Sequence, residues 1–124
     1  MRTELFTLCD YAKNDGGKLT IVDTFDVVIA EKLPWRAYFG FALKLRMENC
    51  DGGKELQLKI IEKDHPDNSL FCVNTVLSQI KEGGILATTG NLKGVVFEKE
   101  GDYEFKILLS EQEVYSFPFK VKLK

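Results

Sequence analysis

The sequence predicts an all-β protein that folds as an antiparallel sandwich of two sheets. Apolar and polar residues alternate with a period of two along several segments, as in strands that bury one face. Turn sequences rich in glycine, proline, asparagine and aspartate separate these segments at intervals of about 8–12 residues. Nine phenylalanines and four tyrosines also favour strands. We expect about eight strands with immunoglobulin-like or related Greek-key topology, and a partly closed barrel is the alternative.

The length and the charge of the chain narrow the class of protein. Its 124 residues fit a single sandwich domain over residues 1–124, enough to bury roughly two thirds of its unfolded surface. The net charge is only -2, with acidic and basic residues interspersed, so no basic surface attracts nucleic acid or an anionic membrane. No apolar run approaches the roughly 20 residues of a membrane helix, and no signal-peptide pattern opens the chain. We therefore predict a cytoplasmic protein with neither a nucleic-acid nor a membrane partner.

The first two strands form a predicted hairpin. Asn14-Asp15-Gly16-Gly17 supplies residues that tolerate positive φ in a tight turn, and a second strand starts at Lys18. Asp23 interrupts the apolar face of that strand, and a charge there needs a partner or water, so we expect a bulge that turns Asp23 outward. The residues predicted to share this face are Leu19, Ile21, Phe25, Val27 and Ile29.

A crossover and the longest alternating strand follow. Pro34 cannot donate a hydrogen bond to a sheet, so residues 31–35 are predicted to cross between the two sheets. Residues 37–47 then alternate without interruption. Their inward set is Ala37, Phe39, Phe41, Leu43, Leu45 and Met47, and their outward set is Tyr38, Gly40, Ala42, Lys44 and Arg46.

Two further turns are predicted in the middle of the chain. Residues 50–53 read Cys-Asp-Gly-Gly and are expected to close a hairpin onto a strand over residues 55–63. His65-Pro66-Asp67-Asn68 has the residue order of a type I turn. Residues 70–80 are expected to form a strand of looser alternation, and residues 85–97 a short strand followed by a loop.

The segment around Tyr103 predicts the corner of a sandwich. In immunoglobulin-like domains, a tyrosine near the start of a late strand lies two residues before a buried core position. Its hydroxyl turns back to the backbone of the preceding loop. Gly101-Asp102-Tyr103-Glu104-Phe105 matches this pattern, with Phe105 in the core position. A last hairpin follows with its turn at residues 111–113, and Pro118 in its second strand predicts an edge position or a bulge.

The reactive side chains form no catalytic or metal-binding motif. The single histidine, His65, lies in a predicted turn, and no third group is placed to orient a cysteine–histidine pair. The three cysteines, Cys9, Cys50 and Cys72, are widely spaced, which is typical of reduced cysteines in a cytosolic protein. We therefore predict no catalytic residue, no metal ligand and no cofactor, and thus a protein that is not an enzyme.

Two pairs of aspartates could be taken for a metal or acid–base site. Asp23 with Asp26, and Asp64 with Asp67, each lie close together in the sequence. Calcium requires about six to eight oxygen ligands, and each pair offers too few in one loop. Because turns favour aspartate for backbone reasons alone, we interpret all four as solvated carboxylates.

Several short motifs are similar to those of a known family. The opening strand reads Phe6-Thr7-Leu8-Cys9-Asp10-Tyr11-Ala12 and is followed by Gly17-Lys18-Leu19-Thr20-Ile21 and Thr24-Phe25-Asp26. The similarity continues through Phe97 and Gly101-Asp102-Tyr103. In these motifs the chain resembles a family of small uncharacterised bacterial proteins, a domain of unknown function. The resemblance implies a compact β-sandwich from a bacterium, and it carries no activity to any residue.

The outward face of the long strand is the best candidate for a partner surface. Gly40 and Ala42 leave the sheet locally flat, which suits the close approach of another backbone. With Tyr38 beside them and Lys59 on the neighbouring strand, they would form a shallow amphipathic patch. A plain solvated face is the simpler alternative. Trp35 is either a plug over the end of the sandwich, which we favour, or an interface anchor.

These observations predict a small non-catalytic module that binds a protein partner or a second copy of itself. The alternative is a small-ligand carrier or an enzyme with a pocket at one end of the sandwich, near Trp35, Asp64 and Asp67. A cavity with convergent polar groups would favour this alternative, whereas a filled sandwich would favour the binding module.

Overall fold

A computed structural model of the chain describes residues 1–48, 51–78 and 84–124. Within these ranges the chain forms nine strands and contains no helix that could cross a membrane. The strands are β1 (Arg2–Asp15), β2 (Lys18–Phe25), β3 (Val27–Ala30), β4 (Trp35–Arg46), β5 (Glu55–Glu62), β6 (His65–Val76), β7 (Ile85–Phe97), β8 (Gly101–Leu109) and β9 (Gln112–Leu123).

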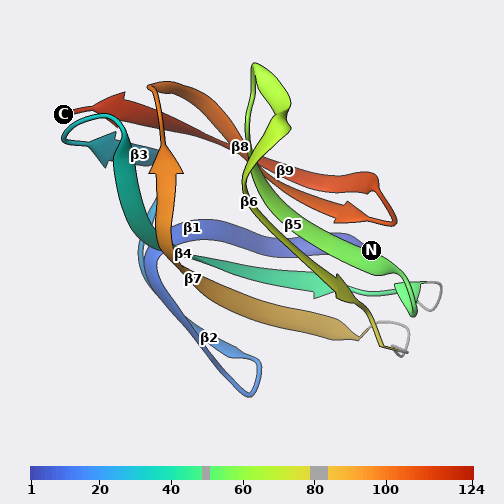
Figure 1. Cartoon of the computed structure of the whole chain (residues 1–124). Coiled ribbons are helices and arrows are strands. Elements are labelled where there is room, and N and C mark those ends of the chain that lie inside the picture. The colour runs from blue at the N-terminus through green and yellow to red at the C-terminus, as the bar shows by residue number, and fades with distance from the viewer. Residues whose placement is uncertain (49–50, 79–83) are drawn as a thin grey trace.

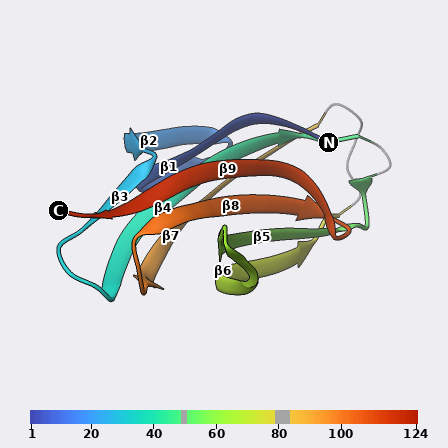
Figure 2. The same ribbon diagram turned by 90° about the horizontal axis from the view of Figure 1, so that it is seen from above.

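The strands form two sheets that lie face to face (Figures 1 and 2). The four-stranded sheet has the order β2-β1-β4-β7, and the five-stranded sheet has the order β3-β9-β8-β5-β6. Both sheets are open, so the predicted all-β sandwich is confirmed and the barrel alternative is not adopted. The immunoglobulin-like topology stays a prediction.

The first hairpin is confirmed. β1 and β2 pair antiparallel up to Asp15 opposite Lys18. The turn residues Gly16 and Gly17 have φ values of 58° and 93°, a region that glycine adopts without a Cβ clash. Asp23 is exposed, as expected. The predicted bulge is absent, because the register of β1 and β2 does not shift at Asp23. Asp23 instead has a positive φ of 53°.

The apolar face predicted for residues 19–29 is divided between the two sheets. β2 belongs to the four-stranded sheet, whereas β3 belongs to the five-stranded sheet and runs parallel to β9. Val28 and Ala30 are buried, while Ile29 is exposed. The prediction that Ile29 points inward is therefore wrong, because the period of two is lost where the chain changes sheet.

The connection between β4 and β5 is a crossover between the sheets. β4 lies between β1 and β7, so both its edges are occupied, and β5 pairs with β6 and β8. The hairpin predicted at residues 50–53 is therefore wrong, and residue 50 itself lies outside the described residues. The crossover predicted at residues 31–35 is confirmed, because β3 and β4 belong to different sheets, although Trp35 is already the first residue of β4.

The turn between β5 and β6 lies earlier than predicted. Lys63 and Asp64 form the turn, and residues 66–68 leave the ladder as an irregularity in β6. Pro66 falls in this irregular stretch, which suits a residue without an N–H to donate. The type I turn predicted at residues 65–68 is therefore wrong.

β7 and the last hairpin differ from the prediction in extent. β7 is one strand of 13 residues, where the sequence predicts a short strand and a loop. Gly94, with a φ of 88°, is the extra residue at a register shift against β4. The hairpin of β8 and β9 is confirmed, with its turn at Ser110 and Glu111. Pro118 has a strand on one side only, because β3 pairs with β9 from Lys120 onward.

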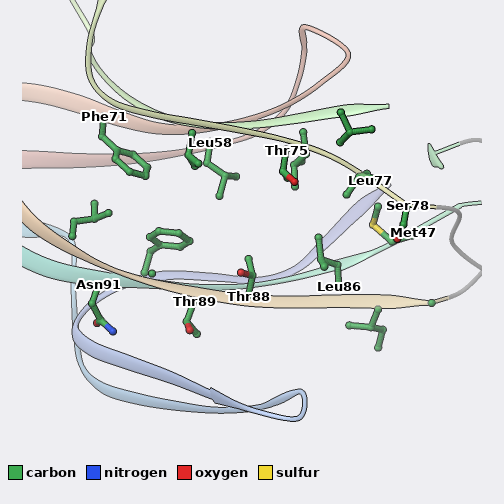
Figure 3. A pocket seen from close by; sticks show the side chains of 18 residues that line it. Met47, Leu58, Phe71, Thr75, Leu77, Ser78, Leu86, Thr88, Thr89 and Asn91 are labelled. Carbon is green, nitrogen blue, oxygen red and sulfur yellow. The ribbon is translucent and has the colours of Figure 1, made fainter. Parts of the chain in front are cut away.

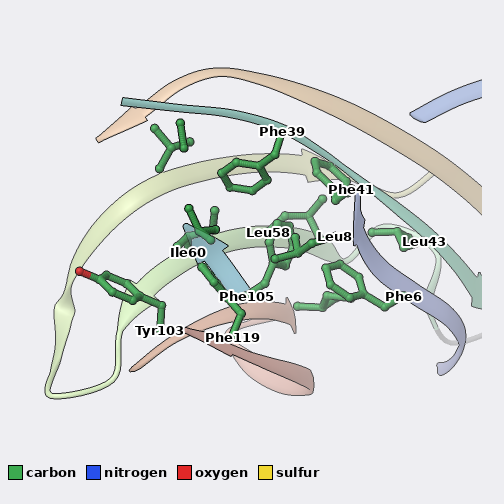
Figure 4. Packing of buried hydrophobic residues seen from close by; sticks show 14 of the residues in the cluster. Phe6, Leu8, Phe39, Phe41, Leu43, Leu58, Ile60, Tyr103, Phe105 and Phe119 are labelled. Carbon is green, nitrogen blue, oxygen red and sulfur yellow. The ribbon is translucent and has the colours of Figure 1, made fainter. Parts of the chain in front are cut away.

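The main core lies between the sheets and contains the predicted corner. Phe105 in β8 is fully buried, and its ring centroid lies 4.7 Å from that of Phe6 and 5.1 Å from that of Phe41 (Figure 4). Tyr103 is also buried, and its hydroxyl donates a hydrogen bond of 2.7 Å to the carbonyl of Lys99. The predicted contact with the preceding loop is confirmed.

Candidate functional site

The structure does not assemble the partner surface predicted around β4. Tyr38 is exposed, but Gly40 and Ala42 are buried, and Lys59 lies on β5 in the opposite sheet. Trp35 is half-buried and packs against the main core. The prediction that Tyr38, Gly40, Ala42 and Lys59 share one surface is therefore wrong, because it depended on a hairpin between β4 and β5.

The far part of the first hairpin covers Gly40 and Ala42. We call this part, residues 10–23, the hairpin arm. Beyond Cys9 the strand β1 leaves the edge of β4. Ala12 donates its backbone N–H to Asn91 Oδ1 at 3.1 Å, and the Asn91 side-chain amide donates to the Ala12 carbonyl at 2.9 Å. The arm thus crosses the outer face of β4 to reach β7. A second small core lies beneath it, formed by Cys9, Ala12 and Ala42 with Leu19 and Ile21.

Gly40 permits this close contact. A Cβ on Gly40 would lie 2.7 Å from Asn91 Oδ1 and 3.3 Å from the backbone nitrogen of Ala12. Only glycine leaves this space, so the flat place on β4 receives a backbone, as the sequence suggests. That backbone is β1 of the same chain and not a partner's.

A groove opens between the two sheets along β6 and β7. Within residues 1–48, 51–78 and 84–124 these two strands are edge strands, and each pairs with a neighbour on one side only. The groove has a volume of about 650 Å³, within the range of roughly 300–1,000 Å³ that is usual for ligand sites. Figure 3 shows it between the ribbons of β6 and β7. We call it the β6–β7 groove.

Inward-facing side chains of both edge strands line the groove. Val73 faces the opposite sheet, because it pairs with the buried Leu58 of β5. Even so it is 45% exposed. Val76 and Ile85 are 67% and 53% exposed, but they pair with Glu55 and Arg46 and so lie on the outer faces of β6 and β7, at the ends of these strands. Contiguous exposed apolar surface is a common feature of interaction sites and ligand grooves. The groove is lined mainly by Phe71, Val73 and Thr75 from β6, by Leu86, Thr88, Gly90 and Leu92 from β7, and by Phe41, Met47, Leu56 and Leu58.

Packed aromatic rings close the inner end of the groove. A Cβ on Gly90 would lie 2.4 Å from the ring of Phe41, so the ring occupies the space that a side chain on β7 would need. The Phe41 centroid lies 6.4 Å from Phe71 and 5.1 Å from Phe105. These contacts join the two sheets behind the open part of the groove.

The groove is chemically uncharged. Among the described residues that line it, none is acidic or basic. Thr75 and Thr88 point into the space between the sheets, whereas Thr89 and Asn91 point away from it (Figure 3). An ionised ligand would lose its hydration there without gaining a counter-charge. The described residues also contain no cluster of three metal-ligating side chains. The groove therefore suits an uncharged, mainly apolar ligand.

A second, smaller hollow lies beside Trp35. Its volume is about 420 Å³, and Phe25, Trp35, Tyr38 and Phe39 contribute to its lining with Asp10. Asp64 and Asp67 do not line it. The end pocket predicted from Trp35, Asp64 and Asp67 is therefore not formed by these three residues together. All four aspartates considered for a metal site, Asp23, Asp26, Asp64 and Asp67, are exposed.

The residues of the groove were not predicted from the sequence. The end of residues 85–97 was expected to be a loop, and the alternation in residues 70–80 was too loose to fix an inward face. The alternation of Leu86, Thr88, Gly90 and Leu92 was a usable signal for a strand. No local pattern shows, however, that β6 and β7 are both edge strands on the same side of the sandwich.

A known family matches almost the whole chain. Residues 4–122 match a family of unknown function, DUF6941. The chain belongs to this family. The predicted resemblance to a family of unknown function is thereby confirmed. The bacterial origin stays a prediction. No curated protein matches the chain.

One solved structure is a distant match to this DUF6941 chain. It is the alkylpurine DNA glycosylase AlkC of Pseudomonas fluorescens, bound to DNA containing an abasic site analogue. The TM-score is 0.45 at 10% sequence identity, and the match covers 94% of this chain but only 30% of that one. The prediction that excluded a nucleic-acid partner is contradicted by this match to a DNA-bound protein and is withdrawn. So weak a likeness assigns no ligand to this chain.

Proposed function

We propose that the protein is a non-catalytic binding module that holds an uncharged, apolar segment of a protein partner in the β6–β7 groove. The exposure of Val73 carries this proposal, since its side chain faces the interior of the sandwich and yet remains 45% exposed. Val76 and Ile85 add exposed apolar side chains at the mouth of the groove, where β6 ends and β7 begins. A segment that covers these side chains would remove apolar area from water, which stabilises the complex.

The positions of the reactive side chains support a role without catalysis. Cys9 is buried beneath the hairpin arm, and burial raises the pKa of its thiol, which disfavours the reactive thiolate. Cys72 is an exposed free thiol on β6, and His65 is exposed beside the β5–β6 turn. A nucleophile needs a base within hydrogen-bonding reach. His65 and Cys72 lie at different positions along β6, opposite Glu62 and Lys59 of β5, and Cys9 belongs to the other sheet. The cytoplasmic location predicted from the sequence is retained in this proposal.

A matched pair of charge substitutions tests the proposal. Val73→Glu places a carboxylate in the groove, whereas Asn74→Glu places the same charge on the outer face of the same strand. A partner captured by the wild-type protein from the native host is purified and titrated against all three proteins. We expect Val73→Glu to weaken binding by roughly tenfold or more, because an unpaired charge must lose its hydration. Asn74→Glu is expected to bind as the wild type does. Equal affinities for all three proteins would place the interaction outside the groove and contradict the proposal.

A small apolar molecule is the second candidate ligand. The groove volume of about 650 Å³ supports it, because this is the size of a small-molecule site. Mass spectrometry of the protein under native conditions, before and after solvent extraction, would detect such a ligand. A neutral compound that copurifies with the wild type and is lost from Val73→Glu would favour the small-ligand carrier over the protein-binding module.

A further inference from the structure

We infer that the partner segment binds as an extended strand that adds to the free edge of β7 and inserts alternate apolar side chains into the β6–β7 groove. This inference rests on the proposed function, because it specifies the partner of the same groove. Strand addition needs free backbone groups at a sheet edge and side-chain sites at alternate positions. The structure provides both.

Alternate residues of β7 direct their backbone groups away from β4. The N–H of Met47 donates to the carbonyl of Gly84 at 2.8 Å, so this pair is a hydrogen-bonded pair of the antiparallel ladder. The register then continues without a shift through Leu92. Because hydrogen-bonded and non-hydrogen-bonded pairs alternate, even-numbered residues over 86–92 bond to β4. Odd-numbered residues over 85–91 direct their N–H and C=O groups to the free edge.

One contact of the hairpin arm supports this assignment. The side-chain amide of Asn14 donates to the carbonyl of Ala87 at 3.0 Å, which requires that this carbonyl is accessible from outside the ladder. β7 has no second neighbouring strand in the part of the chain that the structure describes. The N–H groups of Ile85, Ala87, Thr89 and Asn91 are therefore positioned to bond to an incoming strand.

A strand at this position would fill the groove. It would lie about 4.8 Å beyond β7 in the same sheet, so its inward side chains would face Phe71, Val73 and Thr75 of β6. Residues 85–91 extend over roughly 20 Å, which is enough for about three inward positions. These positions must be uncharged, because none of the described residues that line the groove carries a charge. Alternate positions point outward and can be polar.

A second copy of the chain fits this edge less well than another segment does. If β7 of one copy paired with β7 of another, Thr88 and Gly90 would occupy two of the inward positions. Thr88 carries a polar hydroxyl and Gly90 has no side chain, so neither would cover the apolar walls of the groove. These walls would remain in contact with water. The partner that fits is a segment of another protein with uncharged apolar residues at alternate positions.

Substitution of Thr89 tests the role of the backbone edge. Thr89→Pro removes one outward N–H and leaves the ladder with β4 intact, because the N–H of Thr89 does not bond to β4. Thr89→Val is the matched control, since it keeps the N–H and nearly the same shape. The probes are neutral seven-residue peptides in which valine and threonine alternate. Peptides of the same composition with contiguous valines are the control for the alternation.

We expect the alternating peptides to bind the wild type and Thr89→Val, and to bind Thr89→Pro at least tenfold more weakly. The contiguous peptides should bind more weakly than the alternating ones. Hydrogen exchange measured by NMR gives a second readout on the wild type alone. On peptide binding, the amides of Ile85, Ala87, Thr89 and Asn91 should become protected, whereas those of the even-numbered residues are protected already. This readout decides the question even if Thr89→Pro fails to fold.

The neutral dye Nile red separates failure of the inference from failure of the proposed function. If the dye binds the wild type and not Val73→Glu, while no peptide protects the odd-numbered amides, the groove binds apolar ligands but strand addition is wrong. If neither dye nor peptide binds, both statements are wrong. A peptide-free dimer, detected by light scattering and lost in Thr89→Pro, would assign the edge to a second copy and overturn the inference.

Discussion

At the scale of single residues, Tyr103 holds the loop before β8 to the core. Its ring centroid lies 5.0 Å from that of Phe97 and 5.8 Å from that of Phe119, and its hydroxyl donates to the Lys99 carbonyl. Burial raises the pKa of the Tyr103 phenol. The hydroxyl therefore remains a neutral donor at neutral pH. The ring of Tyr103 is thus packed against aromatic rings of the core, and its hydroxyl has a hydrogen-bond partner.

Tyr103→Phe is expected to lower the free energy of unfolding by about 1 kcal/mol, because the hydrogen bond is lost while the ring remains. Urea unfolding monitored by circular dichroism measures this difference. Tyr38→Phe, at an exposed position of β4, is the control and should leave stability within about 0.5 kcal/mol of the wild type. A Tyr103→Phe protein as stable as the wild type would show that the corner bond contributes nothing.

At the scale of elements, the hairpin arm is a strand pair that leaves its own sheet. Its residues pair with each other, while its inner face packs on the outer face of β4 and reaches β7 through Asn91 and Asn14. Figure 1 shows β2 at one side of the molecule, beyond the body of the sandwich. The arm depends on few contacts, so Gly40 and Asn91 are expected to decide whether it stays in place.

Gly40→Ala adds only a Cβ, at 2.7 Å from Asn91 Oδ1, and should separate the arm from the sheet. We expect a loss of about 1–3 kcal/mol, typical of overpacking, with faster amide exchange throughout residues 10–23. Asn91→Ala should produce the same increase in exchange without any steric clash. Tyr38→Ala on the exposed face of the same strand is the control. If exchange in the arm does not change in either variant, the arm is held by other contacts.

At the scale of the whole molecule, a cluster of aromatic rings joins the two sheets. Phe105 of the five-stranded sheet contacts Phe6 and Phe41 of the four-stranded sheet, and it also lies 6.2 Å from Phe71 (centroid to centroid). The Phe105 ring therefore contacts side chains of both sheets. Loss of its packing should destabilise the two sheets together. The molecule is therefore expected to unfold in one cooperative step.

Phe105→Leu is expected to cost about 1–3 kcal/mol, since a fully buried ring is replaced by a smaller side chain. Phe71→Leu, at a half-buried position of the groove wall, is the matched control and should cost less. Circular dichroism reports on both sheets, and the fluorescence of Trp35, the single tryptophan, reports on β4. Both probes should show the same midpoint. Two separate transitions would mean that the sheets unfold independently.

The sequence by itself determined the class of the fold and the features that depend on near neighbours. The all-β composition, the inward face of β4, the first and last hairpins and the Tyr103 corner were all predicted correctly. Each rests on side-chain alternation or on turn chemistry within about ten residues. These local rules continue to hold after folding, because strand geometry imposes the period of two.

Only the tertiary structure decided which strands share a sheet and which edges stay free. The predicted partner surface combined Lys59 with Gly40 and Ala42, but β1 and β7 occupy both edges of β4 and exclude β5. The same pairing leaves β6 and β7 as edges and opens the groove between them. Strand pairing joins residues that are far apart in the chain. Which pairing forms depends on its free energy relative to that of every alternative pairing. For this reason the groove that we propose as the binding site could be located only in the folded molecule.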